Sequence, residues 1–409
     1  MNKYTRYAAV MLLAVLALGA AHAEDWPTYR HDNRRSGVTA ETLDAGNLTQ
    51  AWVHTPAYPP QPAWSGPAKW DAYAGIVGLR SMRNYDPVFH AVVADGAVYF
   101  GSSAEDCVVS LDAATGEERW SFVVGGPVRI APAYADGNLY FGSDDGYAYC
   151  VRADDSGLVW KYSPAPEQRL IPNDGKMIPL WPIRTGVLVD DGKAYFGAAL
   201  LPWEPAYLCA VNAATGSPEG PGLYCRTMDH VTMEGAILAS PAKLYMPQGR
   251  SAPMVFNREN GDHLGDLEGG GGVFAVLTPD LQIAHGPGNK KGWITLSNAD
   301  TRDKIATVSL GNAMVVTETR SFVLKDTELL ALDRASGDTL WRTETNHPYT
   351  LILAGEALFA GGENAVAAFD TTDGRCLATL SVSGRAHGLA VAGGGLFVST
   401  DTGAIHCFR

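Results

Sequence analysis

The sequence predicts an all-β protein, a single β-propeller, because one phrase recurs along the chain at intervals of about 35 to 50 residues. Residues 94–120 read ADGAVYFGSSAEDCVVSLDAATGEERW, and residues 135–160 read ADGNLYFGSDDGYAYCVRADDSGLVW. Fainter copies begin near residues 190, 240, 328, 355 and 393. A repeat of this length indicates a solenoid, a propeller or an array, and no stretch after the N-terminus keeps a helical period.

Each copy of the repeat predicts four antiparallel strands. An apolar run ends in an Asp-Gly turn, the strongest short hairpin signal, and an aromatic strand follows. A third strand ends in Asp or Asn, a second glycine turn comes next, and the fourth strand often carries Trp. The glycines of this second turn are Gly116, Gly216, Gly261, Gly337 and Gly374. Four-stranded sheets of this kind, arranged radially, make a propeller.

The spacing predicts eight blades, with seven as the alternative. Seven units start near residues 88, 128, 184, 235, 273, 313 and 349, and an eighth starts at Ala386. The eighth reaches Arg409 before its glycine turn and fourth strand. Residues 47–56, NLTQAWVHTP, resemble a Trp-bearing fourth strand. We therefore expect an N-terminal strand at about 47–56 to close the ring, which removes two free sheet edges.

The N-terminus predicts export. Lys3 and Arg6 precede an apolar run over residues 8–21, and Ala21-His22-Ala23 follows. This pattern is typical of a signal peptide spanning residues 1–23 and cut after Ala23. The apolar run is too short for a membrane span. No cysteine lies near the cleavage site, so we expect no lipid anchor. We expect a periplasmic or secreted protein whose propeller comprises residues 24–409.

Charge and cysteine usage restrict the possible functions. The formal net charge of −13 argues against nucleic acid and fits a solvated acidic surface. No zinc spacing or haem-attachment motif occurs, so no metal site is expected. Cys150 and Cys407 fall in a column of small residues and should be packed thiols. Cys209 and Cys225 are the disulfide candidate of the third repeat, and whether they bond is left open.

Interruptions of the repeat predict the binding face. Long segments at 57–87, 163–183 and 217–234, and the turn ALLPWEPAY from Ala198, all fall opposite the tight Asp-Gly turns. Long loops on a rigid scaffold commonly carry function. They contain the candidate ligand-binding residues Trp64, Trp70, Arg80, Arg83, Trp181 and Trp203. Aromatic and guanidinium groups suit a planar, anionic or sugar-like ligand, and the alternative is that each Trp anchors its loop.

Arg129 and Arg184 form a second candidate site. Each lies eleven residues before the aromatic position of its repeat. They should therefore lie on adjacent blades at the mouth of the central channel, with Glu234 next to them. Two guanidinium groups there can hold a ligand carboxylate. The alternative is an Arg–Glu pair that ties neighbouring blades together.

The repeat resembles that of pyrroloquinoline-quinone (PQQ) propellers through YFGS and LDAATGEERW. DWPTYRHDNRRSG at 25–37 and NLTQAW at 47–52 are similar to the opening of quinoprotein alcohol dehydrogenases. They also resemble short exported PQQ-like repeat proteins grouped with the BamB-type outer-membrane assembly factor. The ring of adjacent cysteines that many such dehydrogenases use is absent, and the family's calcium ligands and catalytic base match no positions here.

Two functions follow from this resemblance. The first is an exported propeller that acts as a binding scaffold for a small ligand or an envelope protein through its loop-rich face, without a cofactor. The alternative is a PQQ-dependent oxidoreductase of the alcohol or sugar dehydrogenase type, with PQQ and calcium over the central channel. No catalytic residue is assigned for either function, because no nucleophile elbow, metalloprotease or phosphate-loop motif occurs.

Overall fold

The computed structural model describes residues 24–63, 85–173, 176–249, 251–272, 274–288 and 293–409. The predicted signal peptide, residues 1–23, and residues 64–84 of the predicted loop 57–87 lie outside this part of the chain. The described residues form strands and no helix. Accordingly, none of them belongs to a helix long and apolar enough to cross a membrane. The all-β prediction is confirmed.

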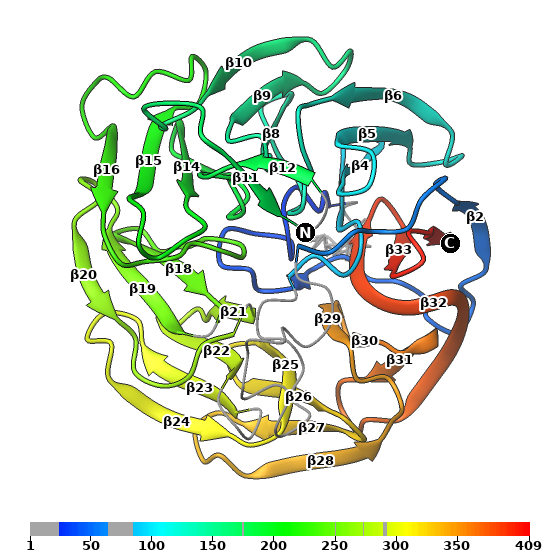
Figure 1. Cartoon of the computed structure of the whole chain (residues 1–409). Coiled ribbons are helices and arrows are strands. Elements are labelled where there is room, and N and C mark those ends of the chain that lie inside the picture. The colour runs from blue at the N-terminus through cyan, green and yellow to red at the C-terminus, as the bar shows by residue number, and fades with distance from the viewer. Residues whose placement is uncertain (1–23, 64–84, 174–175, 250, 273, 289–292) are drawn as a thin grey trace, which may run out of the picture.

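Six four-stranded antiparallel sheets occur within the described residues. In chain order, the first three comprise β3 (Ala91–Ala94), β4 (Ala97–Ser102), β5 (Cys107–Asp112), β6 (Glu118–Val123); β7 (Ala133–Ala135), β8 (Asn138–Gly142), β9 (Ala148–Arg152), β10 (Leu158–Tyr162); and β13 (Leu188–Asp190), β14 (Lys193–Ala198), β15 (Ala206–Asn212), β16 (Tyr224–Met228). The next three comprise β17 (Leu238–Ala239), β18 (Lys243–Gln248), β19 (Ser251–Asn257), β20 (His263–Asp266); β21 (Phe274–Leu277), β22 (Gln282–Gly288), β23 (Trp293–Asn298), β24 (Lys304–Val308); and β25 (Gly311–Val316), β26 (Arg320–Lys325), β27 (Glu328–Asp333), β28 (Thr339–Glu344). The sheets surround a common centre, as in a propeller (Figure 1).

A continuous eight-stranded sheet contains the last repeats and both N-terminal strands. Its strands are β1 (Val38–Thr39), β29 (Thr350–Ala354), β30 (Ala357–Gly361), β31 (Glu363–Asp370), β32 (Cys376–Ala392), β33 (Gly395–Thr400), β34 (Ile405–Phe408) and β2 (Gln50–His54), in that order. The 17-residue β32 runs through both halves. At one edge β2 pairs antiparallel with β34, with Trp52 opposite Cys407 (Figure 1). The strand expected at 47–56 therefore forms and lies beside the last strand of the chain.

The turns have the conformations that their residues favour. In the β3–β4 hairpin both Asp95 and Gly96 have positive φ, 49° and 68°, which is a type I′ turn. The β5–β6 turn closes differently. There the Asp112 carboxylate accepts the backbone N–H groups of Ala114 and Thr115, and Gly116 follows with φ 74°. The strand-ending Asp or Asn and the glycine of each repeat thus form one structural unit.

Neighbouring sheets are joined by the tryptophans of the outer strands. Each indole Nε1 donates to a backbone carbonyl of the next sheet's glycine-turn region. The pairs are Trp52 to Ala113, Trp120 to Ala153, Trp160 to Ala213 and Trp341 to Thr371, at 2.8–3.2 Å. Trp52 belongs to β2, and its contact ties the eight-stranded sheet to the first four-stranded sheet.

Replacing Gly216 by alanine should destabilise the protein more than the same change at Gly337. Both glycines have positive φ, 72° and 79°, so each alanine costs about 1 kcal/mol in backbone strain. At Gly216 the new Cβ would lie 2.7 Å from the Trp160 ring, whereas at Gly337 it meets nothing within 4 Å. We expect the clash to add about 1–3 kcal/mol, measured by urea unfolding. Equal losses for the two variants would contradict this docking role.

Hydrophobic cores lie between successive sheets and between the halves of the eight-stranded sheet. Cys150 and Cys407 are buried free thiols within them, as predicted. The segment 217–234, expected to be a loop between repeats, is different. It contains β16, the outer strand of the third sheet. The prediction was wrong because β16, unlike β6, β10 and β28, carries no Trp to mark it as an outer strand.

The N-terminal segment, residues 24–43, runs across the centre of the ring (Figure 1). Its backbone bonds to the inner strand of one sheet after another. Trp26 pairs with Val93, Pro27 O accepts from Tyr134 N, Asn33 O from Ala239 N, Arg34 O from Leu277 N, and Gly37 O from Leu353 N. The Glu41 carboxylate then accepts from the N–H groups of Gly393 and Gly394. This segment therefore closes the channel at the end where the inner strands finish.

Two buried arginines hold this segment in place. Arg35 donates through Nε to Ile237 O and through Nη1 to Thr28 Oγ1, Tyr29 O and Asp32 O. Arg30 reaches the opposite side of the ring and donates to Leu351 O and Met314 O. The guanidinium groups thus donate hydrogen bonds to backbone carbonyls of the inner strands, which would otherwise be buried without a partner.

Candidate functional site

A buried network of charged side chains lies where the inner strands of the first three sheets begin. Asp144, in the turn after β8, accepts Arg129 Nε at 2.8 Å on Oδ2. The same carboxylate accepts Arg184 Nε at 2.9 Å and Nη2 at 2.8 Å. Arg129 Nη1 also donates to Asp86 Oδ2 at 2.7 Å. Asp144 thus joins the two arginines that the sequence placed on adjacent blades.

Burial and pairing set opposite pKa shifts for the two aspartates. Burial raises the pKa of Asp86, and the single guanidinium of Arg129 offsets this only in part. Burial acts on Asp144 as well, but Arg184 and Arg129 together hold the pKa of its carboxyl below the ordinary value. Arg184 Nη1 also lies 3.8 Å from Glu234 Oε1. The network therefore contains two guanidinium groups among three carboxylates.

The network also fixes both described ends of the loop 57–87. Ala63 N donates to Asp86 Oδ2 at 2.9 Å, and Gln61 O accepts Arg129 Nη1 at 2.8 Å. Tyr85 is buried beside Ala63, and burial raises the pKa of its phenol well above the ordinary value. Both arginines thus pair mainly with aspartates, and the Arg–Glu pair given as the alternative corresponds to the 3.8 Å contact of Arg184 with Glu234; ligand binding by either arginine stays a prediction. Their guanidinium groups face carboxylates of the chain itself.

Sequence reasoning missed Asp86, Asp144 and Tyr85. Asp144 belongs to the sequence SDDG of the second repeat. The available signal was its position directly after the aromatic strand, where the first repeat has Ser103 and Ala104 in the same turn. Asp144 places a carboxylate at this position, close to the two arginines that were predicted to face inward. A buried carboxylate needs a cationic partner, so its pairing with these arginines could have been inferred.

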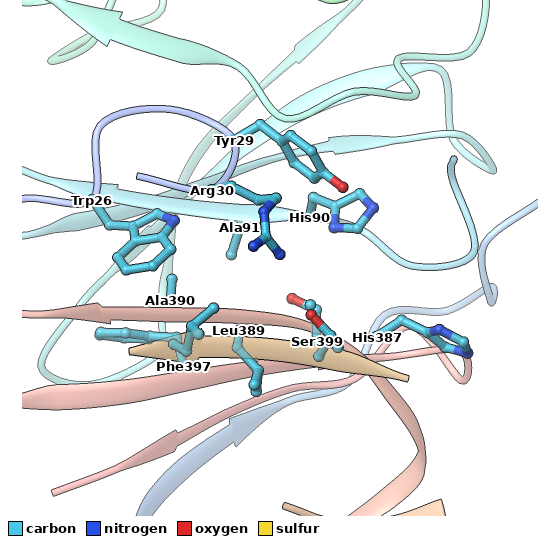
Figure 2. A pocket seen from close by; sticks show the side chains of 13 residues that line it. Trp26, Tyr29, Arg30, His90, Ala91, His387, Leu389, Ala390, Phe397 and Ser399 are labelled. Carbon is cyan, nitrogen blue, oxygen red and sulfur yellow. The ribbon is translucent and has the colours of Figure 1, made fainter. Parts of the chain in front are cut away.

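A small pocket lies between the N-terminal segment and the ring. Trp26, Tyr29 and Arg30 lie on one side of it, with His90 of the first sheet's inner edge. Side chains of β32 and β33 lie on the other side (Figure 2): Leu389, Ala390, Phe397 and Ser399. Its volume of about 20 Å³ is room for about one water molecule. His90 Nε2 donates to Tyr85 O at 3.1 Å, and burial lowers the pKa of the imidazole to about 4. His90 is therefore neutral at physiological pH.

Two insertions form an outer surface on the third and second sheets. The hairpin of β11 (Leu170–Asn173) and β12 (Lys176–Pro179) arises from the predicted segment 163–183. The loop 199–205 between β14 and β15 packs beside it. Arg169 Nη2 lies 3.0 Å from Glu204 Oε1, and Trp181 Nε1 donates to Pro205 O at 2.7 Å. We call the hairpin and this loop together the insertion surface.

The predicted tryptophans of this surface have different environments. Trp181 is buried in the core beneath the hairpin, which is the anchoring role given as the alternative. Trp203 is 72% exposed, and Leu170 and Met177 of the hairpin are 54% and 59% exposed. The other candidates in long loops, Trp64, Trp70, Arg80 and Arg83, lie outside the described residues.

Cys209 and Cys225 lie opposite each other on β15 and β16. Both are free thiols, and their Sγ atoms are 3.2 Å apart. Cys209 is fully buried, whereas Cys225 is exposed. The geometry agrees with the expected pairing of third and fourth strands, and the disulfide itself stays a prediction.

Comparison with known protein families agrees with the repeat. A model of PQQ-like repeat proteins, described as outer membrane protein assembly factor BamB, matches residues 83–219 and 290–377, more than half of the chain. The chain belongs to this family. The match covers most of the first three sheets of the PQQ-like propeller and the strands from β23 to β31. No curated protein matches the chain.

Solved structures with the same fold are distant in sequence. Quinohemoprotein alcohol dehydrogenase from Comamonas testosteroni is 13% identical, with a TM-score of 0.66 over 96% of this chain and 81% of its own. A europium-containing methanol dehydrogenase is 12% identical, with a TM-score of 0.60 over 91% and 89%. Sqt1 from Saccharomyces cerevisiae is 13% identical, with a TM-score of 0.58 over 79% and 95%. At this identity the similarity shows the propeller fold alone.

The described residues do not fit PQQ and calcium. A quinone carboxylate at Arg129 or Arg184 would have to displace Asp144 or Asp86, which already accept their N–H groups. Neither arginine lines the small pocket beside Trp26 and Arg30, so that pocket does not offer them to a quinone. Among the described residues, no group of three His, Cys, Asp or Glu side chains is placed to bind a metal.

Proposed function

We propose that this PQQ-like propeller is a non-catalytic binding scaffold that docks an apolar segment of an envelope protein on the insertion surface. The observation that carries the proposal is the exposure of Leu170, Met177 and Trp203 on two interruptions of the repeat. Exposed Trp on a preorganised surface is a common centre of protein–protein interfaces. A protein segment is therefore favoured over a small ligand, which needs a concave pocket.

The insertion surface is rigid enough to serve as a preformed site. The Arg169–Glu204 ion pair joins the hairpin to the loop at the residues next to Leu170 and Trp203. At the hairpin tip, Lys176 Nζ lies 2.9 Å from Asp106 Oδ1 of the first sheet. Trp181 and the inward-facing Ile171 and Ile178 anchor the base in the core. A surface held on three sides costs little conformational entropy on binding.

The chemistry of the hairpin defines how the partner is held. Pro172 and Pro179 lack N–H groups, so neither strand offers a continuous edge for addition of a partner strand. Side chains rather than backbone hydrogen bonds must supply the contact. Because the chain has a formal net charge of −13, basic residues flanking the partner's apolar segment would be favoured.

A photo-crosslinking experiment tests this function. With p-benzoylphenylalanine in place of Trp203, irradiation of the exporting cells should give one dominant protein adduct. Added unlabelled wild-type protein should compete for it at least tenfold better than the Leu170→Ser and Trp203→Ser double variant. The matched control places the same probe at Leu340, which is 47% exposed on the outer strand β28. Equal adducts at both positions, or equal competition by the variant, would overturn the proposal.

We further infer that the ring has eight blades closed by β2 and that the protein is periplasmic or secreted. The pairing of β2 with β34 and the docking of Trp52 on Ala113 support the closure. The two halves of the eight-stranded sheet would be the seventh and eighth blades. The predicted signal peptide supports export, and detection of a new N-terminus at Glu24 in the mature protein tests it.

The PQQ-dependent oxidoreductase of the alcohol or sugar dehydrogenase type is the second candidate. Its support is the fold shared with quinohemoprotein alcohol dehydrogenase. The arginines, whose N–H groups already donate to Asp86 and Asp144, argue against it. If purified protein mixed with PQQ and calcium retains the quinone absorbance through gel filtration, this second function replaces the first.

A further inference from the structure

We propose that Cys225 and Cys209 form a thiol–disulfide exchange site, in which Cys225 attacks an incoming disulfide and Cys209 resolves the mixed disulfide. The ligand class is a small disulfide such as glutathione disulfide. The site lies on the outer strand β16 and its neighbour β15, outside the insertion surface residues that carry the proposed function.

The geometry gives the two thiols different roles. Cys225 is exposed and can meet a disulfide from solvent, whereas Cys209 is fully buried behind it. Their Sγ atoms, 3.2 Å apart on directly opposite residues, need only side-chain motion to reach bonding distance. The equivalent opposite pairs in the first two sheets are Val109–Ser121 and Tyr149–Lys161. The dithiol is therefore particular to the third sheet.

The surroundings of Cys225 favour its thiolate. The Cys209 thiol donates to Cys225 Sγ and lowers the pKa of Cys225 to about 7, against burial and with further help from Tyr162. Burial raises the pKa of Cys209 well above the ordinary value. Cys225 therefore ionises more readily near neutral pH than an ordinary cysteine does.

The exchange balances in two steps. The Cys225 thiolate attacks one sulfur of the small disulfide, forms a mixed disulfide and releases one small thiolate. Cys209 then loses its proton to solvent and attacks Cys225 Sγ, which releases the second small thiolate and forms the Cys209–Cys225 bond. One disulfide is reduced to two thiols, and the protein dithiol is oxidised to one disulfide.

The test uses the full-length reduced protein carrying Cys376→Ser, which removes the other exposed thiol. After glutathione disulfide at pH 7, intact mass should show loss of two hydrogens and no retained glutathione. With Cys209→Ser added, whose hydroxyl still donates to Cys225, one glutathione should remain on Cys225. Cys209→Ala is the second variant if serine impairs folding of the core. With Cys225→Ser instead, the rate of modification should fall at least tenfold.

Cys376 in the otherwise wild-type chain is the internal control. It is exposed, and its Sγ contacts Ala378 O and Thr379 Oγ1 rather than a second thiol. It should therefore retain its glutathione, while the Cys209–Cys225 peptides become disulfide-linked. A stable adduct on Cys225 with Cys209 present would overturn the proposal. So would modification of Cys209 at the wild-type rate in the Cys225→Ser protein.

Discussion

Arg184→Met should lower the free energy of unfolding by about 3–5 kcal/mol at neutral pH. The Arg184 side chain is fully buried and gives Asp144 two of its three charged hydrogen bonds. Methionine keeps much of the volume but leaves Asp144 with Arg129 alone, while Glu234 stays buried nearby. Removing one partner of a buried ionic network costs far more than the network contributes over an apolar replacement. Urea unfolding followed by tryptophan fluorescence measures the loss.

The control is Arg385→Met. Arg385 Nε lies 2.9 Å from Glu363 Oε2, at similar length to the buried contact, but both side chains are more than half exposed. Such pairs contribute less than about 1 kcal/mol. Arg184→Lys separates charge from geometry, because lysine keeps the cation and loses the two-point contact. A loss for Arg184→Met no larger than that of the control would show that the network does not hold the first three sheets together.

Trp26→Ala should cost about 3–5 kcal/mol and loosen the N-terminal segment. The Trp26 ring is 1% exposed and packs in the core shared by the first sheet and the eight-stranded sheet. The centroid of the ring also lies 5.0 Å from that of the His31 ring, with the two planes at 58°, and the Trp26 backbone pairs with Val93. Limited proteolysis within residues 24–43 should become faster in step with the fall in stability, because the segment then detaches from the inner strands.

Trp203→Ala is the matched control for this change. The same atoms are removed, but from a side chain that is 72% exposed. Its unfolding free energy should therefore change by less than about 0.5 kcal/mol. If Trp26→Ala resembled Trp203→Ala, the N-terminal segment would be an accessory to the ring rather than a part of its core.

The repeat made most of the fold predictable. Turn chemistry is local, so Asp95-Gly96 and Gly116 could be assigned from neighbours in sequence. The role of Trp120 and Trp160 also follows locally, since each docks at the same place in the next copy. β16 was not predicted because it lacks the Trp. The hairpin β11–β12 was not predicted because Pro172 and Pro179 are typical of loops.

The candidate site was less predictable because its contacts join residues far apart in the chain. Counting residues back from the aromatic position placed Arg129 and Arg184 together, as the structure does. No neighbouring residue in the sequence, however, shows that Asp144 and Asp86 accept hydrogen bonds from these arginines. The contacts of the motif DWPTYRHDNRRSG were not predictable either, because the sequence showed only its resemblance to a known family. In the structure Arg30 and Arg35 of this motif bind carbonyls more than 200 residues away. Trp181 is buried and Trp203 is exposed, and the composition of their loops does not show this difference.

The pairing of β2 with β34 has a consequence for the order of synthesis. Gln50 pairs with Phe408, so β2 finds its partner only after all the residues between the two strands have been translated. Until then the four-stranded sheets can form, but β2 has no partner strand and one edge of β33 stays unpaired. The export proposed above would gain time from this arrangement. The late partner thus delays this step of folding until β34 has been made.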